Sequence, residues 1–452
     1  MNAAQIAGQW ALPPAAALPV LIVLLIALAV AVVRLKSRAA RYVLIVLWLR
    51  FAMDSFSSFS LREAFGGVTW NAAGSILFTL AGLSIIRYRH LLLAVLLPIY
   101  GLLAIMAVSS LANGVPFAMV EQGAKFGLLI CMIIGTYEAA NEEGAERFAA
   151  SLMVPFLLPI AMQVISLAFG IGKVAESDGS VSYVGGFFHE STFSISVAAG
   201  LVGLCFAGRA SSPSRILFLL ASTGALIAAN YRTTVIAMLP LLLYLLASIP
   251  VLAVRRNARV LVASVGALLA IVAISSSSLD MGQRVQSVID FAAAPSKLIR
   301  PLDSFTEDER QQASGRSYVW SKYIEGFNRS PPLQKLIGNG PDSWEAVFNV
   351  YAQNTVISYL YEIGWIGAAI VIILWLVMLL LALRTPPAVM PAILLLHFGY
   401  AVLNMSTQPF WAVEGLMMYG LICGFTLHYA YARVAARANS GPAQRGVRVV
   451  NA

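Results

Sequence analysis

Long apolar runs recur along the whole chain, and they limit the possible folds more than any other feature of the sequence. Residues 16–33 contain no charged side chain, and comparable runs follow at short intervals as far as residue 432. A helix needs about 20 such residues to cross the hydrocarbon core of a bilayer. The strands of an outer-membrane barrel alternate between apolar and polar residues instead. The pattern therefore predicts an all-α polytopic membrane protein and argues against a barrel.

Composition supports this class and excludes several others. Of the 452 residues, 59% are apolar and only 11% are charged, which is half or less of the charged share of a soluble domain. A soluble enzyme, a disordered protein and a disulfide-stapled secreted domain are therefore excluded. The basic residues stand singly at the ends of apolar runs. The net charge of +9 thus indicates membrane topology and not a nucleic-acid partner.

The apolar runs predict thirteen transmembrane helices, or twelve if the crossings within residues 216–253 are miscounted. The predicted spans lie near 16–33, 42–60, 68–86, 91–110, 124–138, 149–171, 192–208, 216–229, 234–253, 259–276, 355–383, 388–404 and 412–432. This pattern divides the chain into N-terminal transmembrane helices 1 to 10 over 1–276, one large periplasmic loop with short helices over 277–354, C-terminal transmembrane helices over 355–432, and a disordered cytoplasmic tail over 433–452.

The distribution of basic residues predicts the orientation. We expect an uncleaved first span with the N-terminus outside, because basic residues follow the first apolar run and none precedes it. The connections and tail on the predicted cytoplasmic side then hold 17 of the 30 basic residues, and the short outer connections hold four. Cytoplasmic loops carry such an excess of Lys and Arg. The long segment 277–354 is thereby placed on the outer face, where an insertion among short turns is the natural place for function.

The sequence predicts neither a metal site nor a cofactor. Cys131, Cys205 and Cys423 lie inside apolar runs, where we expect small buried side chains. No cluster of His, Cys and Asp has metal-ligand spacing, and there is no P-loop or dinucleotide fingerprint. Arg50 and Asp54 stand one helical turn apart within a predicted span, so we expect them to pair with each other, with a proton path as the alternative.

Two short outer connections carry candidate site residues. His189 and Glu190 are the one adjacent acid–base pair in the chain, although an interfacial hydrogen bond is an alternative role for His189. Arg232 and Thr233 lie in a connection so tight that Arg232 must sit at or just below the outer interface. Its guanidinium can reach lipid headgroups. Alternatively, with the neighbouring hydroxyl, it can bind a phosphate bidentately.

The long loop contains a predicted amphipathic helix. In residues 314–327, apolar side chains recur at helical spacing, and the helix carries Arg316, Tyr318 and Trp320. Aromatic residues in such numbers are typical of an interfacial belt. They are also the side chains on which sugar rings stack, which would explain aromatic residues away from the ends of the spans.

The rest of the loop completes the candidate site. A turn-rich segment contains Asp342, and Gln353 and Asn354 lead into the next span. On the same face, Arg232 and Arg316 can converge on one dianionic group. Buried charge at a membrane is costly unless it has a function. Arginines, aromatic residues and a lipid-facing wall together fit a lipid-linked, pyrophosphate-bearing sugar.

Several of these stretches resemble the O-antigen ligase and Wzy-type polymerase superfamily of bacterial glycan assembly. The matching stretches are GFFHE (186–190), YRTT (231–234), GRSYVW (315–320), LIGNGPDSW (336–344), AQNT (352–355) and YEIGWIG (361–367). Their order, their spacing and their position around a large outer loop agree with the superfamily over roughly residues 180–375.

The resemblance implies a metal-independent, inverting glycosyl transfer on the periplasmic face, from an undecaprenyl-pyrophosphate-linked glycan. Arg232 and Arg316 would then hold the donor pyrophosphate. In ligases the end of the loop reads His-Asn, and the His is proposed to activate the acceptor hydroxyl, whereas this chain has Gln353 and Asn354. Gln cannot act as a general base, so either Gln353 orients the acceptor or the base lies elsewhere. The alternatives for the base are His189, Glu190, Asp342 and Glu345.

This departure favours a polymerase of exopolysaccharide or O-antigen repeat units over a ligase that transfers finished glycan to a lipid A core. A transporter or flippase is the alternative from another class. The expected partners are the undecaprenyl-pyrophosphate-linked glycan and the bilayer of the bacterial inner membrane, and a chain-length regulator or export machinery is a further candidate. The catalytic candidates are Gln353, Asn354, His189 and Glu190, and the substrate-binding candidates are Arg232, Arg316, Thr233, Tyr318, Trp320 and Asp342.

Overall fold

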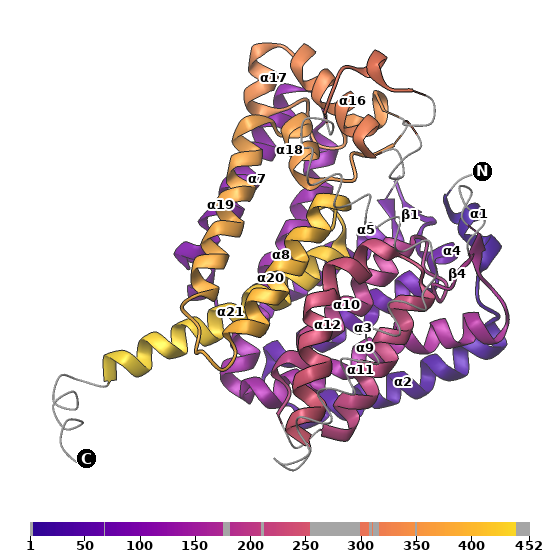
Figure 1. The fold of residues 1–452 in the computed structure, drawn as a ribbon, viewed down its shortest axis with the longest axis vertical. Coiled ribbons are helices and arrows are strands. Elements are labelled where there is room, and N and C mark those ends of the chain that lie inside the picture. The colour runs from indigo at the N-terminus through magenta and orange to yellow at the C-terminus, as the bar shows by residue number, and fades with distance from the viewer. Residues whose placement is uncertain are drawn as a thin grey trace.

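The computed structural model shows a predominantly helical protein (Figure 1). It describes residues 3–66, 68–174, 181–208, 212–253, 299–306, 310, 316–348 and 350–439. Strands within these residues form two small antiparallel pairs, β1 (Glu63–Phe65) with β2 (Val68–Thr69) and β3 (Lys173–Val174) with β4 (Val181–Ser182). The N-terminal and central helices are α1 (Ala3–Ala7), α2 (Pro14–Arg34), α3 (Arg38–Ser55), α4 (Ser57–Ser60), α5 (Trp70–Ile85), α6 (Tyr88–Leu91), α7 (Leu97–Ala112), α8 (Pro116–Glu143), α9 (Ala145–Ala168), α10 (Glu190–Phe206), α11 (Ser212–Ala228) and α12 (Arg232–Ala253). The later helices are α16 (Arg316–Arg329), α17 (Pro332–Ile337), α18 (Thr355–Glu362), α19 (Gly364–Ala382), α20 (Met390–Ser406) and α21 (Val413–Asn439).

The length and apolar composition of its helices indicate an all-α membrane protein, as the sequence predicts. In the described part of the chain, six helical stretches are long and apolar enough to cross a bilayer, namely Pro14–Arg34, Ala94–Ala112, Pro116–Glu143, Ala145–Ala168, Arg232–Ile249 and Gly364–Ala382. The helices α5, α10, α11 and α20 are also apolar but shorter. Twelve of the thirteen predicted spans overlap a helix, and the predicted span 259–276 lies outside the described residues.

Local signals in the sequence explain where several helices begin and end. The Ser37 hydroxyl accepts a hydrogen bond from the amide of Ala40 at 3.3 Å and thereby caps α3. Thr69 caps α5 in the same way. Gly144, at φ +83°, separates α8 from α9 in a backbone conformation that a side chain would strain.

The structure corrects the predicted span 355–383. This segment forms two helices, α18 and α19, because the helix is interrupted between Glu362 and Gly364, where Gly364 has a φ of +74°. The apolar stretch that can cross a bilayer begins only at Gly364. Helix α18 packs instead against α16 and α17 of the loop region (Figure 1). Hydropathy does not report such a break, because Glu362 is a single charged residue between two apolar stretches.

The core of the bundle is built around α8 and α21, which pack along each other. Gly420 and Gly424 of α21 face Met132 and Thr136 of α8, and a Cβ atom at either glycine would overlap these side chains. Small residues allow membrane helices to approach closely, so van der Waals contact between them is extensive. The close pair α8–α21 also carries residues of the candidate site toward one end of the bundle.

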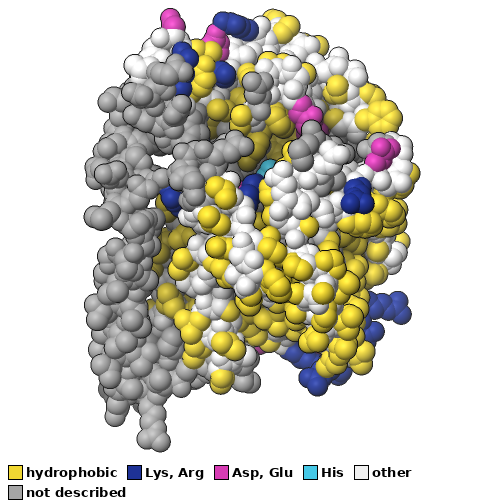
Figure 2. Space-filling view, turned by 90° about the vertical axis from the view of Figure 1, so that its right-hand side faces the viewer, with side chains coloured by type: hydrophobic (Ala, Val, Ile, Leu, Met, Phe, Trp, Pro, Cys, Tyr) yellow, Lys and Arg dark blue, Asp and Glu magenta, His cyan; other side chains and the backbone are white. Residues whose placement is uncertain are grey.

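Connections that the sequence assigns to one side of the membrane meet at one end of the bundle. The Arg147 guanidinium donates to the carbonyl of Arg34 at 2.6 Å, and Arg433 donates to the carbonyl of Thr385 at 2.6 Å. The helices α16, α17 and α18 lie at the opposite end (Figure 1). On the face in Figure 2, hydrophobic side chains dominate the middle, and Lys and Arg side chains lie at both the upper and the lower end.

The predicted pair of Arg50 and Asp54 is confirmed, and it has a third member. The Arg50 Nη2 atom lies 3.3 Å from Asp54 and 2.5 Å from Glu414 of α21, and all three side chains are buried. Arg50 Nε also donates to Glu414 at 2.6 Å. This ion cluster therefore ties α3 to α21 inside the bundle.

We expect Arg50→Met to lower the free energy of unfolding by about 3 to 5 kcal/mol, because it removes the cation that two buried carboxylates share. The matched control is Arg87→Met. Arg87 forms an ion pair with Glu142 at the surface, where such a pair contributes about 0 to 1 kcal/mol. Chemical unfolding of both variants in detergent micelles measures the difference, and equal losses would contradict a stabilising role of the buried cluster.

Candidate functional site

A small aromatic core fixes the end of the loop against α16. Trp320, Tyr323 and Phe327 of α16 are buried and pack with Ile357 and Tyr361 of α18. This arrangement matches the amphipathic helix that the sequence predicts in the loop. The Trp320 indole N–H donates to the carbonyl of residue 352 at 2.8 Å. The backbone that leads to Gln353 is therefore held in place by the core.

Arg316 joins the loop to the first turn of α12. Its Nε donates to Gln353 Oε1 at 3.2 Å, and its Nη2 donates to Thr233 Oγ1 at 3.1 Å. Arg232, the first residue of α12, directly precedes Thr233. Arg316 thus connects the first turn of α12 to the loop helix and the end of the loop. Their guanidinium and hydroxyl groups can bind one anion without a metal.

Gln353 and Asn354 have different roles in this arrangement. Gln353 has a φ of +53°, a conformation that non-glycine residues seldom adopt and that tends to persist at functional sites. Its amide is directed to Arg316. Asn354 instead caps α18, since its Oδ1 accepts from the amide of Ile357 at 3.2 Å and its Nδ2 donates to the carbonyl of Met405 at 3.1 Å. Both functional groups of Asn354 are thus engaged in positioning the chain.

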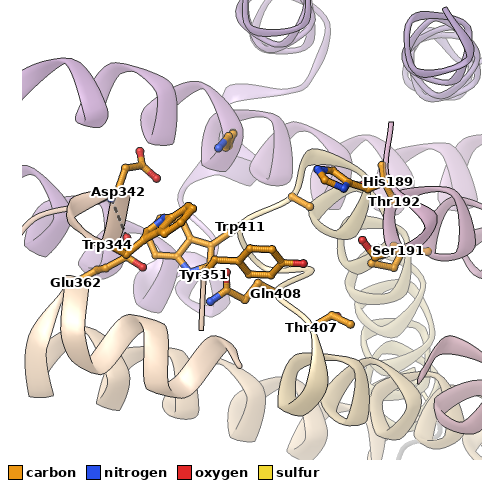
Figure 3. A pocket seen from close by; sticks show the side chains of 13 residues that line it. His189, Ser191, Thr192, Asp342, Trp344, Tyr351, Glu362, Thr407, Gln408 and Trp411 are labelled. Carbon is orange, nitrogen blue, oxygen red and sulfur yellow. Dashed lines mark hydrogen bonds between the residues drawn. The ribbon is translucent and has the colours of Figure 1, made fainter. Parts of the chain in front are cut away.

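A cavity with a volume of about 220 Å³ is lined by Tyr351, which lies two residues before Gln353 in the chain (Figure 3). Figure 3 shows Asp342, Trp344 and Glu362 at one end and His189 and Thr192 at the other. Aromatic and polar side chains lie between the two ends. The full lining consists of Lys125, His189, Ser191, Thr192, Ile195, Asp342, Trp344, Tyr351, Glu362, Thr407, Gln408, Trp411 and Ala412.

Arg316 acts on the cavity through Tyr351. Tyr351 lines the cavity. Burial raises the pKa of Tyr351, and the nearby Arg316 guanidinium opposes this increase. The charge of Arg316 therefore acts at the wall of the cavity. An anion held by Arg316 can extend into the cavity along Tyr351.

The His189 end of the cavity has a neutral base and an ion pair. The side chain of His189 is open to the cavity, yet removal from water lowers its pKa, and the ammonium of Lys173 lowers it further. Lys173 Nζ lies 3.2 Å from the carboxylate of Glu190 and donates to the carbonyl of Phe188 at 3.3 Å. His189 is thus available as a base, whereas Glu190 is neutralised by its partner.

The other end of the cavity has two carboxyl groups. The backbone amide of Asp342 donates to Glu362 Oε2 at 2.7 Å, and the Ser358 hydroxyl donates to the other oxygen of Glu362. Gln122 Nε2 of α8 donates to Asp342 Oδ2 at 3.3 Å. Burial raises the pKa of Glu362 to about 8 and also raises that of Asp342. Glu362 is therefore mostly protonated at pH 7.

Two predicted aromatic contacts lie away from the cavity. Trp320 is enclosed in the aromatic core of the loop. The Tyr318 ring lies 5.4 Å from that of Phe305, and the ammonium of Lys322 lies 4.6 Å above it. Neither side chain lines the cavity described above. The aromatic residues that do line it are Trp344, Tyr351 and Trp411.

Sequence reasoning did not select Lys125, Glu362, Gln408 or Trp411. Lys125 stands at the edge of the predicted span 124–138, where a polar residue normally indicates only the end of a span. Glu362 is a single charged residue inside the predicted span 355–383. Gln408 and Trp411 occupy the short connection before α21. The one sequence signal for these two residues is a polar Gln–Pro turn next to two aromatic residues. This signal does not indicate which cavity the turn faces.

A second and larger cavity adjoins the first. Its volume is about 750 Å³, and it shares Lys125, Trp411 and Ala412 with the smaller one. Arg50 and Glu414 of the buried ion cluster form part of its wall. The remaining lining residues are Leu61, Gly66, Val68, Thr69, Asn71, Ala72, Ser75, Ile76, Phe117, Val120, Glu121, Ala124 and Val413.

No protein-family model matches the chain, and the search of curated proteins gives no match either. Within the residues that the structure describes, no group of three or more His, Cys, Asp or Glu side chains could hold a metal ion.

We expect Asn354→Ala to lower the free energy of unfolding by about 0.5 to 2 kcal/mol, because it removes a helix cap. The matched control is Ser37→Ala, which removes the cap of α3 at the other end of the bundle. Hydrogen exchange separates the two variants. Asn354→Ala increases exchange in residues 350–362, and Ser37→Ala leaves exchange in that segment unchanged. If residues 350–362 exchange at the same rate in Asn354→Ala and in Ser37→Ala, Asn354 does not position this segment.

Proposed function

We propose that the protein is a glycosyltransferase of the bacterial inner membrane that polymerises undecaprenyl-pyrophosphate-linked oligosaccharide repeat units. The single observation that carries the proposal is that Arg316 contacts both Thr233 and Gln353 beside a cavity with a carboxyl end. In this proposal the chain crosses the membrane thirteen times, and the segment 277–354 is a periplasmic loop. The reaction is metal-independent and inverts the anomeric centre.

The charges suit this chemistry. The leaving group is a lipid-linked pyrophosphate, which is already a stabilised dianion. Arg316 and Arg232 supply preorganised cationic donors where negative charge develops, as a metal ion does in other enzymes. Guanidinium groups bind phosphate oxygens bidentately. No further electrophile is required at the pyrophosphate.

The shape of the cavity suits a sugar. Trp344, Tyr351 and Trp411 provide aromatic faces, and Thr407 and Gln408 provide groups that can form hydrogen bonds with hydroxyls. Ligand sites generally combine apolar or aromatic walls with a few placed polar groups. Repeat units of a growing polysaccharide fit this combination. The larger cavity next to it offers room for a second substrate.

A second reading within the same class is a ligase that transfers the finished glycan to a lipid A core. Both enzymes use the same donor, and they differ in the acceptor. Gln353 at the end of the loop favours the polymerase, because it replaces the His of the ligases that the chain resembles. Purified protein that is given only lipid-linked repeat units distinguishes them, since a polymerase makes a ladder of products and a ligase makes none.

One observation favours a candidate from another class. The buried cluster of Arg50, Asp54 and Glu414 borders the larger cavity, and intramembrane ionisable groups often belong to ion or substrate pathways. A transporter or flippase is therefore the second candidate function. It predicts movement of a lipid-linked substrate across a proteoliposome membrane without a change in its glycan length.

We expect the variant Leu333→Cys to react with a membrane-impermeant maleimide added on the periplasmic side, because Leu333 is exposed on α17. The matched variant is Glu142→Cys, near the opposite end of the bundle, which should react only after lysis. The wild-type protein with its three cysteines provides the background. Labelling of both positions from the same side would contradict the proposed topology.

We expect Arg232→Ala and Arg316→Ala each to reduce polymer formation by about 100-fold or more, because each removes a donor that stabilises the leaving pyrophosphate. Arg316→Lys should recover only part of the activity, since an ammonium cannot bind as a planar fork. The measurement is the product ladder from purified protein in nanodiscs with lipid-linked repeat units.

The matched control for this experiment is Arg329→Ala. Arg329 lies on the same helix as Arg316 but is exposed and paired with Glu325, so its loss should leave the ladder unchanged. Normal ladders from Arg232→Ala and Arg316→Ala, with the protein correctly folded in the membrane, would overturn the assignment of the pyrophosphate site.

A further inference from the structure

The small cavity has two ends of different chemistry. At one end, Arg316 acts on the wall at Tyr351, and the pair of Lys173 and Glu190 lies beside His189. At the other end are Asp342 and Glu362 (Figure 3). In an inverting displacement the nucleophile attacks from the side opposite the leaving group. If the pyrophosphate occupies the arginine end, the acceptor hydroxyl approaches from the carboxyl end.

The carboxylate of Asp342 is held in position from several directions. Asp342 lies in a turn at φ +60°, and its backbone amide is bound by Glu362 at 2.7 Å. Its side chain accepts from Gln122 at 3.3 Å and lines the cavity. Each of these contacts comes from a different helix, α18 or α8. The position of the carboxylate is therefore set by the packing of the bundle and not by the loop alone.

The larger cavity gives an acceptor a route to Asp342. Lys125 lines both cavities, and Gln122, which binds Asp342, lies one helical turn before it on α8. Asp342 therefore lies in the smaller cavity close to Lys125, which borders both cavities. A second saccharide in the larger cavity can place a hydroxyl between Asp342 and a sugar in the smaller one.

We infer that Asp342 is the general base that activates the acceptor hydroxyl, and that Glu362 and Gln122 are positioning residues for it. The inference rests on the proposed glycosyl transfer. In this step the acceptor oxygen forms a bond to the anomeric carbon, and the bond from that carbon to the pyrophosphate oxygen breaks. The hydroxyl proton passes to the Asp342 carboxylate, and the leaving oxygen keeps the electron pair beside Arg316 and Arg232.

The charged surroundings of Asp342 favour this role. Glu121 and Lys125 face it from α8 and form an ion pair of 2.7 Å, Glu345 follows it in the chain, and His189 lies at the far end of the cavity. Burial raises the pKa of Asp342, which makes its carboxylate a stronger base. Glu362 is mostly neutral at pH 7, so it adds little repulsion when Asp342 is charged.

The test compares Asp342→Asn with wild-type protein in nanodiscs. We expect kcat to fall by about 100-fold to 10,000-fold, the range for loss of a general base, with the affinity for an undecaprenyl-pyrophosphate probe unchanged. In wild-type protein the rate should rise with pH through the raised pKa of Asp342, and in Asp342→Asn this rise should disappear. The matched control is Asp303→Asn, an exposed loop residue, which should retain wild-type kcat and pH dependence.

Two further variants test positioning. Glu362→Gln keeps an oxygen that accepts from the Asp342 amide, so kcat should stay within a few-fold of wild type. Glu362→Ala removes that oxygen, so kcat should fall while the KM for the donor stays constant. An Asp342→Asn variant that keeps the wild-type kcat would overturn the inference. The inference would also be overturned if the rate loses its rise with pH in His189→Asn and keeps it in Asp342→Asn. If wild-type protein itself makes no polymer, the proposed function fails and the inference fails with it.

Discussion

The two hydrogen bonds of Arg316 are the contact on which the rest of the site depends. They connect Thr233 and Gln353, which come from a tight connection between helices and from the end of a long loop. A guanidinium is charged at every physiological pH and needs several acceptors, so its partly buried position is favourable only with such partners. These two bonds use Nε and Nη2 of the guanidinium group. Its remaining N–H groups can therefore bind an anion. An anion that binds there adds acceptors without displacing the structural ones.

Much of the helical pattern could be predicted from the sequence, because crossing a bilayer imposes a length and a polarity that single residues report. Each predicted span inside the described residues overlaps a helix. The break at Gly364 could not be predicted in this way. It depends on a positive φ and on the close approach of Leu336 to Gly364, and neither property changes the hydropathy of the segment.

The candidate site was predictable to a lesser degree. The motifs YRTT and GRSYVW drew attention to Arg232, at the edge of an apolar span, and to Arg316, on a predicted amphipathic helix of the loop. Trp320 shows the opposite case, because its sequence context is the same whether the indole faces a ligand or a core. Only the hydrogen bond to residue 352 and the burial of the ring decide between these roles. Lys125 enters the site through the packing of α8, which local sequence does not encode.

The two cavities also bear on how the proposed polymerase would distinguish its two substrates. A polymerase must bind two similar lipid-linked substrates in different roles, so its sites must differ in chemistry more than in size. Here the smaller cavity has Tyr351, on which the charge of Arg316 acts, in its wall and a carboxyl pair at one end, whereas Arg50 in the larger cavity is already paired with Asp54 and Glu414. A pyrophosphate that entered the larger cavity would have to compete with these two carboxylates for its cation. For the proposed polymerase, this difference favours donor binding beside Arg316 and leaves the larger cavity to the uncharged part of an acceptor.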